Sequence, residues 1–298
     1  RGLHHLVFEI VDNSIDEAVA GFCDWIRVSI NQDNSITVYD NGRGIPVDIH
    51  PQMGKPALEV ILTTLHSGGK FGGSGYTISG GLHGVGLSVV SALSELMEIT
   101  VFRDGKIYRQ DYGKGKPLTP LYEDGSSKEN GTSIRFVPDP EIFEETVFDS
   151  EIIINRLREL AFLNKGLRIT FNDYRVDEPA KDFHYDEGIK AFVAYVNKSK
   201  EVLNDEPLYF EGKKDDVIVK VAIQYNNGYS ENIYSFANNI RTQEGGTHEV
   251  GFKNGLTRII NDYAKKNGLL KESDGNLSGE DIREGMAAIV SVLVKEPQ

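Results

Sequence analysis

The N-terminal segment most constrains the fold, because it carries an unbroken helical pattern. Its apolar residues recur at three- and four-residue spacing over positions 3–18, which is about five turns of helix. Gly21 follows as a typical helix end. His5, Glu9 and Asn13 lie four residues apart, so they share one face of that helix, beside its buried stripe. By itself this pattern is also typical of an ordinary amphipathic helix with a solvated polar face.

Two glycine-containing segments follow this helix. Residues 25–30 and 35–39 alternate apolar and polar side chains and predict two strands, after which the loop DNGRGIP occupies 40–46. Of the 21 residues in 66–86, nine are glycine. Because glycine loses much freedom on ordering, we expect a mobile lid there or a backbone that approaches a ligand closely. A helix resumes at 85–93, and a glycine-rich loop that opens into a helix suits phosphate.

The remaining pattern predicts an α+β protein of two domains, 1–186 and 187–298, since 298 residues are ample for two. In the first domain, antiparallel strands mixed with helices predict an α/β sandwich with helices on one face of the sheet. Further strands are expected there at 97–102, 106–111, 118–122, 132–137 and 167–172, with a helix at 150–164. In the second domain we expect helices at 189–197 and 248–267 and strands at 217–225, 233–238 and 286–294.

Composition narrows the class of protein. No apolar run is long enough to span a bilayer and no signal peptide is visible, so a soluble protein without membrane contact is expected. Cys23 is the only cysteine, which excludes an intrachain disulfide and fits a reducing, cytoplasmic location. The net charge of −13 argues against a large nucleic-acid surface on this chain.

Six motifs, taken together and in this order, resemble the ATPase subunits of bacterial type II DNA topoisomerases, the gyrase B and topoisomerase IV group. They are EIVDNSIDEA (9–18), DNGRGIP (40–46), LHSGGKF (65–71), SGGLHGVG (79–86), GT (131–132) and GGTH (245–248). The resemblance covers essentially the whole chain. It implies a nucleotide-binding domain of the gyrase, heat-shock-chaperone, histidine-kinase and MutL type, followed by a transducer domain with a ribosomal-protein-like fold.

The resemblance also implies an ATP site with Mg²⁺. Glu9 matches the general base that activates water, and His5 matches the histidine that orients it. Asn13 matches the magnesium ligand, a hard oxygen donor of the kind that this ion prefers. Asp40 matches the residue that accepts a hydrogen bond from the adenine amine, and Thr132 matches a second polar group near the base.

Other residues match supporting positions of the same family. One wall of the adenine pocket is matched by Gly44, Ile45 and Pro46. The residues that wrap the phosphates are matched by Lys70, Leu82, His83, Gly84, Val85 and Gly86. Asp16 matches a residue that supports the site from behind, and Glu17 matches the partner of Arg43 at the pocket mouth. Arg103 matches the arginine that aminocoumarin antibiotics engage. Without the resemblance, Glu17 and Arg103 are equally typical of solvated side chains.

The resemblance implies two parts that the sequence does not contain. One is an arm before the first helix that closes over the nucleotide of a second copy, and the other is a Gln-Thr-Lys loop whose lysine contacts the γ-phosphate. We therefore expect a fragment, truncated before the C-terminal end of its transducer domain. It is expected to bind nucleotide and inhibitors, to hydrolyse ATP poorly and to stay monomeric.

For the complete enzyme, the resemblance implies assembly with a gyrase A-type subunit and a second copy of this subunit (A2B2), and DNA strand passage with negative supercoiling. Duplex DNA is then the substrate of the complete enzyme and contacts this fragment little or not at all. Topoisomerase IV, a decatenating relative, stays open as an alternative, and a MutL-type mismatch-repair ATPase is a more remote one. A histidine kinase fits less well, because its catalytic domain normally lacks a glutamate four residues before the asparagine.

Overall fold

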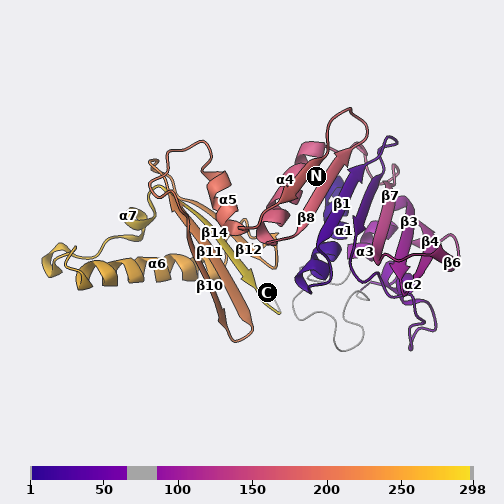
Figure 1. Cartoon of the computed structure of the whole chain (residues 1–298), viewed down its shortest axis with the longest axis horizontal. Coiled ribbons are helices and arrows are strands. Elements are labelled where there is room, and N and C mark those ends of the chain that lie inside the picture. Colours follow the sequence, from indigo (N-terminus) through magenta and orange to yellow (C-terminus); the bar gives the residue numbers. More distant parts are fainter. Residues whose placement is uncertain (1, 66–85, 296–298) are drawn as a thin grey trace. The chain divides into compact units, whose positions relative to one another are not determined.

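The computed structural model describes residues 2–65 and 86–295, and the chain divides into two compact units, Arg1–Asp186 and Glu187–Gln298 (Figure 1). In the part of the chain that is described, no helix is long and apolar enough to cross a membrane.

The first unit is built on one mixed sheet. Its described strands run in the order β5-β4-β3-β7-β2-β1-β8-β9, with β6 paired to β4. The strands are β1 (Trp25–Ile30), β2 (Ile36–Asp40), β3 (Ser94–Arg103), β4 (Lys106–Gly113), β5 (Lys116–Pro117), β6 (Tyr122–Ser126), β7 (Gly131–Pro138), β8 (Arg168–Asp173) and β9 (Lys181–His184). All pairings are antiparallel except that of β1 with β8. The helices are α1 (Gly2–Val19), α2 (Ala57–Thr63), α3 (Gly86–Ala92) and α4 (Ser150–Leu163).

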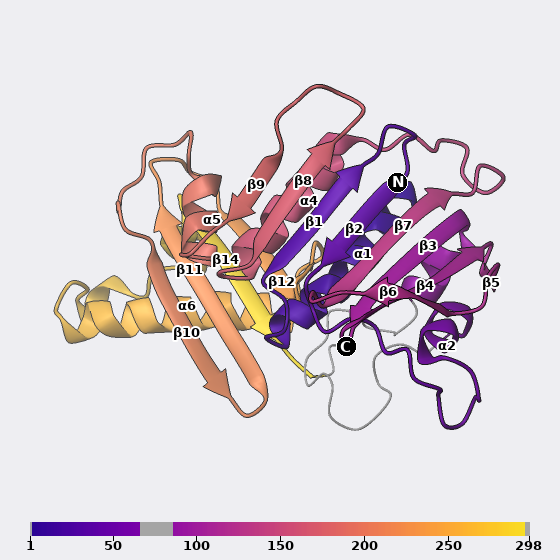
Figure 2. The same ribbon diagram turned by 45° about the vertical axis from the view of Figure 1, so that its right-hand side comes forward.

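Helix α1 packs against the sheet through its apolar stripe. Figure 2 shows α1 along one face of the sheet. Val7, Ile10 and Val11 are almost completely buried and belong to a core that also takes in the inward side chains of β1 and β2. Because side chains alternate along a strand, the face of β2 that carries Ile36 and Val38 also carries its last residue. The strand period therefore places Asp40 on the core side of the sheet.

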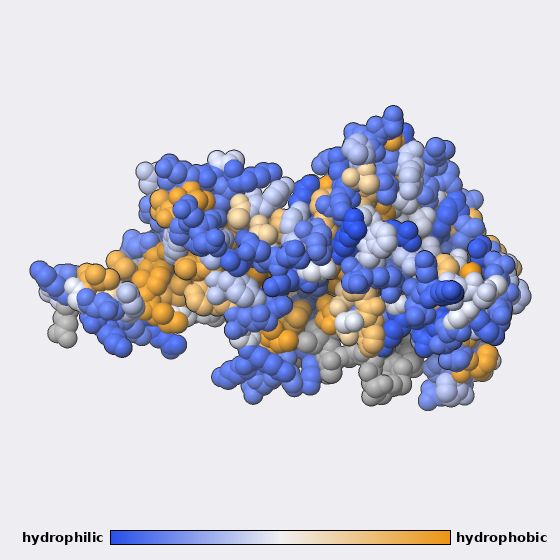
Figure 3. Space-filling view, viewed as in Figure 1, coloured by the Kyte–Doolittle hydropathy of each residue, from blue (hydrophilic) through white to orange (hydrophobic). Residues whose placement is uncertain are grey.

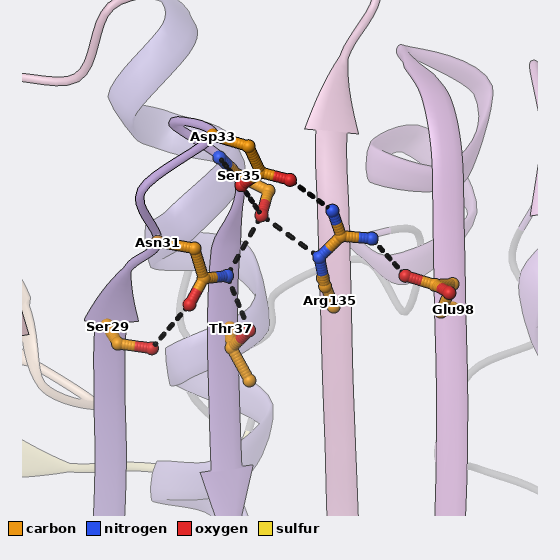
Figure 4. Close-up of polar contacts among 7 residues, drawn as sticks. All are labelled: Ser29, Asn31, Asp33, Ser35, Thr37, Glu98 and Arg135. Carbon is orange, nitrogen blue, oxygen red and sulfur yellow. Dashed lines mark hydrogen bonds and ion pairs between the residues drawn. The ribbon is translucent and has the colours of Figure 1, made fainter. Parts of the chain in front are cut away.

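The opposite face of the sheet carries a polar network that ties three strands together (Figure 4). Arg135 of β7 donates to Glu98 of β3 and to Ser35 and Asp33, which lie in the turn just before β2. The Asn31 amide donates to Ser35 Oγ at 2.9 Å. These bonds replace water for side chains that the strand period directs away from the core, and they keep β2 beside β7.

The second unit contains a five-stranded sheet in the order β10-β11-β14-β12-β13. Its strands are β10 (Leu208–Lys214), β11 (Val217–Tyr225), β12 (Asn232–Ala237), β13 (Ile240–Arg241) and β14 (Met286–Leu293). Its helices are α5 (Ile189–Val196), α6 (Thr247–Lys266), α7 (Gly279–Arg283) and the short 3-10 turn η1 (Glu272–Asp274). Strands β11 and β14 supply most of its core.

Helix α6 keeps part of its apolar face at the surface. Val250, Ile259 and Tyr263 are each more than half exposed, and apolar residues gather over this helix in Figure 3. Only Asn261 and Ala264 of this helix are buried among the described residues.

The predicted helices and most predicted strands are present, but the strand predicted at 118–122 is wrong. The chain bends after β5, and β6 begins only at Tyr122. The bend is held by side-chain bonds, since Thr119 Oγ1 accepts from the Asp111 amide and the Thr119 carbonyl accepts from Gln110. Pro120 also has no N–H to give to a ladder. The edge strands β9 and β10 were not predicted, because their residues lack a sustained apolar alternation.

The burial of α1 makes a test of the fold possible. Ile10→Ala should lower the unfolding free energy of the first unit by about 2–4 kcal/mol, because Ile10 is 1% exposed and the truncation leaves a cavity. Trp25, the only tryptophan, lies in this unit, so its fluorescence in urea reports this transition. Ile152→Ala is the matched control, since that side chain on α4 is 45% exposed. Equal losses in the two variants would contradict the role assigned to the buried stripe.

Candidate functional site

Helix α1 presents a line of polar residues. His5, Glu9 and Asn13 are exposed and one turn apart, as their spacing requires. The Asn13 amide nitrogen donates to the Glu9 carbonyl at 2.6 Å, and the His5 ring packs edge-on against Phe8. The Asn13 side-chain oxygen is therefore the atom that is left to face a ligand.

The first residue of α3 lies directly over the Glu9 side chain. A Cβ built on Gly86 would overlap Glu9 Oε2. A side chain at this position would therefore displace the end of the Glu9 side chain from where it lies. Lys70, Leu82, His83, Gly84 and Val85, which were also predicted to bind phosphate, lie outside the described residues.

Asp40 ends β2 as a buried carboxylate. It is 7% exposed; its Oδ2 accepts from the Ser14 hydroxyl at 2.8 Å and its Oδ1 accepts from the Gly42 amide at 3.0 Å. Burial raises the pKa of Asp40 to about 6, against the opposing effect of the Ser14 and Gly42 bonds. This side chain is an acceptor that has left water, and the Thr132 backbone N–H is a further donor to it besides Ser14 and Gly42.

Strand β7 holds the adjoining wall. Gly131 has a φ of +146°, and a Cβ there would overlap the Asp40 carbonyl oxygen, so the close approach of β7 to β2 requires glycine. The next residue, Thr132, accepts from the Ile45 amide at 3.2 Å through its hydroxyl. This bond fixes the loop of Gly44, Ile45 and Pro46 against β7.

Two arginines lie along the same loop. Arg43 donates from Nε and Nη2 to the two carboxylate oxygens of Glu17 at 3.1 and 2.8 Å, and its backbone amide donates to the same group at 3.0 Å. The Arg43 guanidinium also covers the Phe22 ring at 3.9 Å. Arg103 Nη1 donates to the Gly44 carbonyl at 2.7 Å. The loop is thus held to α1 on one side and to β3 on the other.

Sequence reasoning missed two residues of α1. Ser14 reaches Asp40, although its position on the apolar stripe gave the only signal, a hydroxyl where an apolar residue is expected. Asp12 lies 3.5 Å from Arg156, and burial raises its pKa to about 6 while Arg156 opposes the shift. Asp16, which was predicted to support the site, is buried on the same helix.

The arrangement combines groups suited to a nucleotide. Asp40 is a buried acceptor for a donor group of a ligand. Glu9 is an exposed carboxylate under the Gly86 backbone, and the side-chain oxygen of Asn13 lies one turn further along α1. The described residues contain no group of three or more His, Cys, Asp or Glu that could hold a metal ion by itself. An ion with one protein ligand and other ligands from a phosphate and water fits this donor set, and Mg²⁺ binds in this way.

Two family models match the chain. Residues 1–142 match the family described as histidine kinase-, DNA gyrase B-, and HSP90-like ATPase, and residues 188–298 match the family described as DNA gyrase B. The DNA gyrase B protein of Halalkalibacterium halodurans is 60% identical over 299 residues, covering 100% of this chain and 47% of that protein. For the DNA gyrase B protein of Thermotoga maritima the identity is 55% over 305 residues, covering 100% and 48%.

Two solved structures are similar to this chain over nearly its whole length. The 43K ATPase domain of Thermus thermophilus gyrase B, in complex with an aminocoumarin, has a TM-score of 0.87 and 42% identity, covering 100% of this chain and 77% of that one. The topoisomerase IV ATP-binding domain of Francisella tularensis, in complex with a small-molecule inhibitor, has a TM-score of 0.81 and 32% identity, covering 99% and 78%.

The first unit therefore has the fold of the histidine kinase-, gyrase B- and HSP90-like ATPases. Two findings identify the family more narrowly: the second unit matches the DNA gyrase B family model, and the whole chain is 60% identical to DNA gyrase B proteins. The chain belongs to the DNA gyrase B family. It spans about half the length of the curated relatives that it matches.

The raised pKa of Asp40 should make the unfolding free energy depend on pH. The folded state binds the Asp40 proton more tightly than the unfolded state, so protonation stabilises the fold below pH 4, and this contribution is lost as the pH rises through about 6. The unfolding free energy of the wild type minus that of Asp40→Asn should fall by on the order of 2–3 kcal/mol over this window.

Trp25 fluorescence in urea at several pH values measures this difference. Asp12 titrates in the same range but is present in both proteins, so its effect cancels. A difference that does not change between pH 4 and 6 would contradict the assignment of a raised pKa to Asp40.

Proposed function

We propose that this chain is the ATP-binding and ATP-hydrolysing part of a bacterial DNA gyrase, with residues 1–186 as the nucleotide-binding domain and 187–298 as part of the transducer domain. The observation that carries the proposal is that one helix serves both ends of the site. Helix α1 contacts the buried Asp40 through Ser14 and lies under the Gly86 backbone at Glu9. A nucleotide has a base at one end and a phosphate chain at the other. The base needs a partner such as Asp40, and the phosphate chain needs different partners, near Glu9 and Gly86.

In this proposal Asp40 reads the base. Its carboxylate accepts a hydrogen bond from the exocyclic amine of adenine, whereas guanine has a carbonyl at that position and would be repelled. A buried acceptor that is left unpaired is costly, which makes this contact selective. Thr132 contributes a second polar group near the base, and Gly44, Ile45 and Pro46 form one wall of its pocket.

Asn13 is the proposed protein ligand for Mg²⁺. Its amide nitrogen is engaged with the Glu9 carbonyl, which directs the side-chain oxygen to the ion. When bound, Mg²⁺ neutralises phosphate charge and completes its shell with phosphate oxygens and water. Lys70 and the segment Leu82–Gly86, carried over from the family pattern, are the proposed phosphate partners.

Glu9 is the proposed general base. Its carboxylate takes the proton of the water that attacks the γ-phosphate, so that ADP leaves as the new phosphorus–oxygen bond forms. His5, one turn before it on α1, is proposed to orient this carboxylate. Asp16 supports the same helix from its buried side.

Arg43, Glu17 and Arg103 are proposed to shape the mouth of the pocket. Because the Thermus thermophilus relative was solved with an aminocoumarin, we infer that such an inhibitor also binds this chain, with Arg103 among its contacts. The ion pair of Arg43 with Glu17 keeps the loop in place for either ligand.

For the complete enzyme we propose a cytoplasmic assembly of two gyrase A-type subunits with two copies of the protein to which this chain belongs. ATP-driven closure of the two copies would pass one DNA duplex through another and introduce negative supercoils. Gyrase B proteins from several bacteria are 55–60% identical to this chain, which favours gyrase over topoisomerase IV. Relaxed plasmid incubated with the complete enzyme and ATP should become negatively supercoiled; decatenation without supercoiling would assign the chain to topoisomerase IV.

The role of Glu9 is tested in the complete enzyme made with the full-length protein. Glu9→Ala should reduce ATP turnover by at least about 100-fold, since the general base is lost, while ATP affinity is retained. Steady-state hydrolysis and equilibrium nucleotide binding measure the two effects separately. Glu151→Ala, an exposed glutamate in the first turn of α4, is the control and should change neither. Turnover that survives in Glu9→Ala would show that Glu9 is not the base.

A further inference from the structure

A buried serine on α1 holds the carboxylate that reads the base. Ser14 is 2% exposed and Asp40 is 7% exposed, and they meet at 2.8 Å across the interface of α1 with β2. We propose that Ser14 is a positioning residue that orients the Asp40 carboxylate toward the adenine amine and so sets the preference for adenine. This inference rests on the proposed function, because it assigns a means of selectivity to the same site.

The direction of the bond follows from the chemistry of the two groups. An ionised carboxylate only accepts, so the Ser14 hydroxyl must donate to Asp40 Oδ2. The Gly42 amide donates to the other oxygen, Oδ1, at 3.0 Å. Together with a backbone hydrogen bond from Thr132, these donors fix the plane of the carboxylate and occupy three of its about four acceptor positions, which leaves one for a ligand.

The surroundings of Asp40 make this donor necessary. Burial raises the pKa of Asp40, and the negative charge of Glu17 raises it further. Arg43 pairs with that Glu17 carboxylate, and Asp40 also interacts electrostatically with the thiol of Cys23 and the phenol of Tyr39. A protonated Asp40 would offer an O–H to the adenine amine. The Ser14 bond opposes that outcome, because it stabilises the charged, accepting form.

The position of Ser14 also links the two ends of the site. It follows Asn13 directly on α1, and Glu9 lies on the same helix. Helix α1 is therefore held to the base-reading carboxylate by a side chain next to the proposed metal ligand. Neither Asn13 nor Glu9 makes a bond to Asp40 that could take the place of this one in the described structure.

Binding of two nucleotides distinguishes a positioning role of Ser14 from a general loss of structure. The full chain as wild type and as Ser14→Ala is titrated with ATP and with purine riboside triphosphate, which lacks the 6-amino group. The Kd for ATP should rise about tenfold in Ser14→Ala, the value expected for the loss of one hydrogen bond to a charged group, while the Kd for the analogue stays unchanged. Ser14→Thr keeps the hydroxyl and should restore the preference for ATP.

Ser94→Ala is the matched control, since Ser94 is equally buried in the first unit but donates to the Val90 carbonyl instead. It should leave both affinities unchanged. Equal weakening of ATP and the analogue by Ser14→Ala, or no weakening of either, would overturn the inference.

A second measurement needs no nucleotide. Carbon-13 NMR of the Asp40 carboxyl group gives its titration midpoint, which should rise by about one pH unit in Ser14→Ala. An unchanged midpoint would overturn the inference even if ATP binds. If the wild type failed to bind ATP while the midpoint still shifted, the proposed function would fail and the coupling of Ser14 to Asp40 would stand.

Discussion

The burial of α1 against the sheet is the constraint on which the first unit depends. Its apolar stripe, including Val7 and Ile10, is almost completely withdrawn from water, and this burial stabilises the core of the unit. The same packing determines which way the polar residues point. Glu9 and Asn13 stay exposed beside the stripe, and Ser14, within it, faces the end of β2. The site is thus a consequence of how the helix is buried.

Close backbone approach is the second physical requirement. Gly131 lets β7 lie against the carbonyl of Asp40, and Gly86 lets α3 begin over Glu9. A methyl group at Gly131 would overlap that carbonyl oxygen and force β7 away from β2, whereas a methyl group at Gly86 would displace the end of the Glu9 side chain. Around these contacts, Glu17 with Arg43 and Thr132 with Ile45 hold the intervening loop by hydrogen bonds, and the Ile45 side chain packs against the core. The apolar core stabilises the unit, and the glycines and the hydrogen bonds of the loop determine the geometry of the site.

Strong periodicity was read correctly from the sequence, and weak periodicity was not. The helical spacing of 3–18 and the alternation of β1 and β2 are local signals, so the elements could be predicted without knowing their neighbours. The bend after β5 depends on Thr119 bonding to a strand that lies earlier in the chain, and β10 is an edge strand without a buried face. Such elements are decided by partners that local sequence does not reveal.

The sequence by itself determined that Glu9 and Asn13 share a helix face, because helical geometry fixes residues four apart. The order of its motifs is also enough to identify the family. Only the tertiary structure decided that Ser14 donates to Asp40 and that Asp12 meets Arg156, since each pair joins segments distant in the sequence. It also decided that Asp40 is buried deeply enough to raise its pKa, because burial is a property of packed layers and not of a residue or its neighbours along the chain.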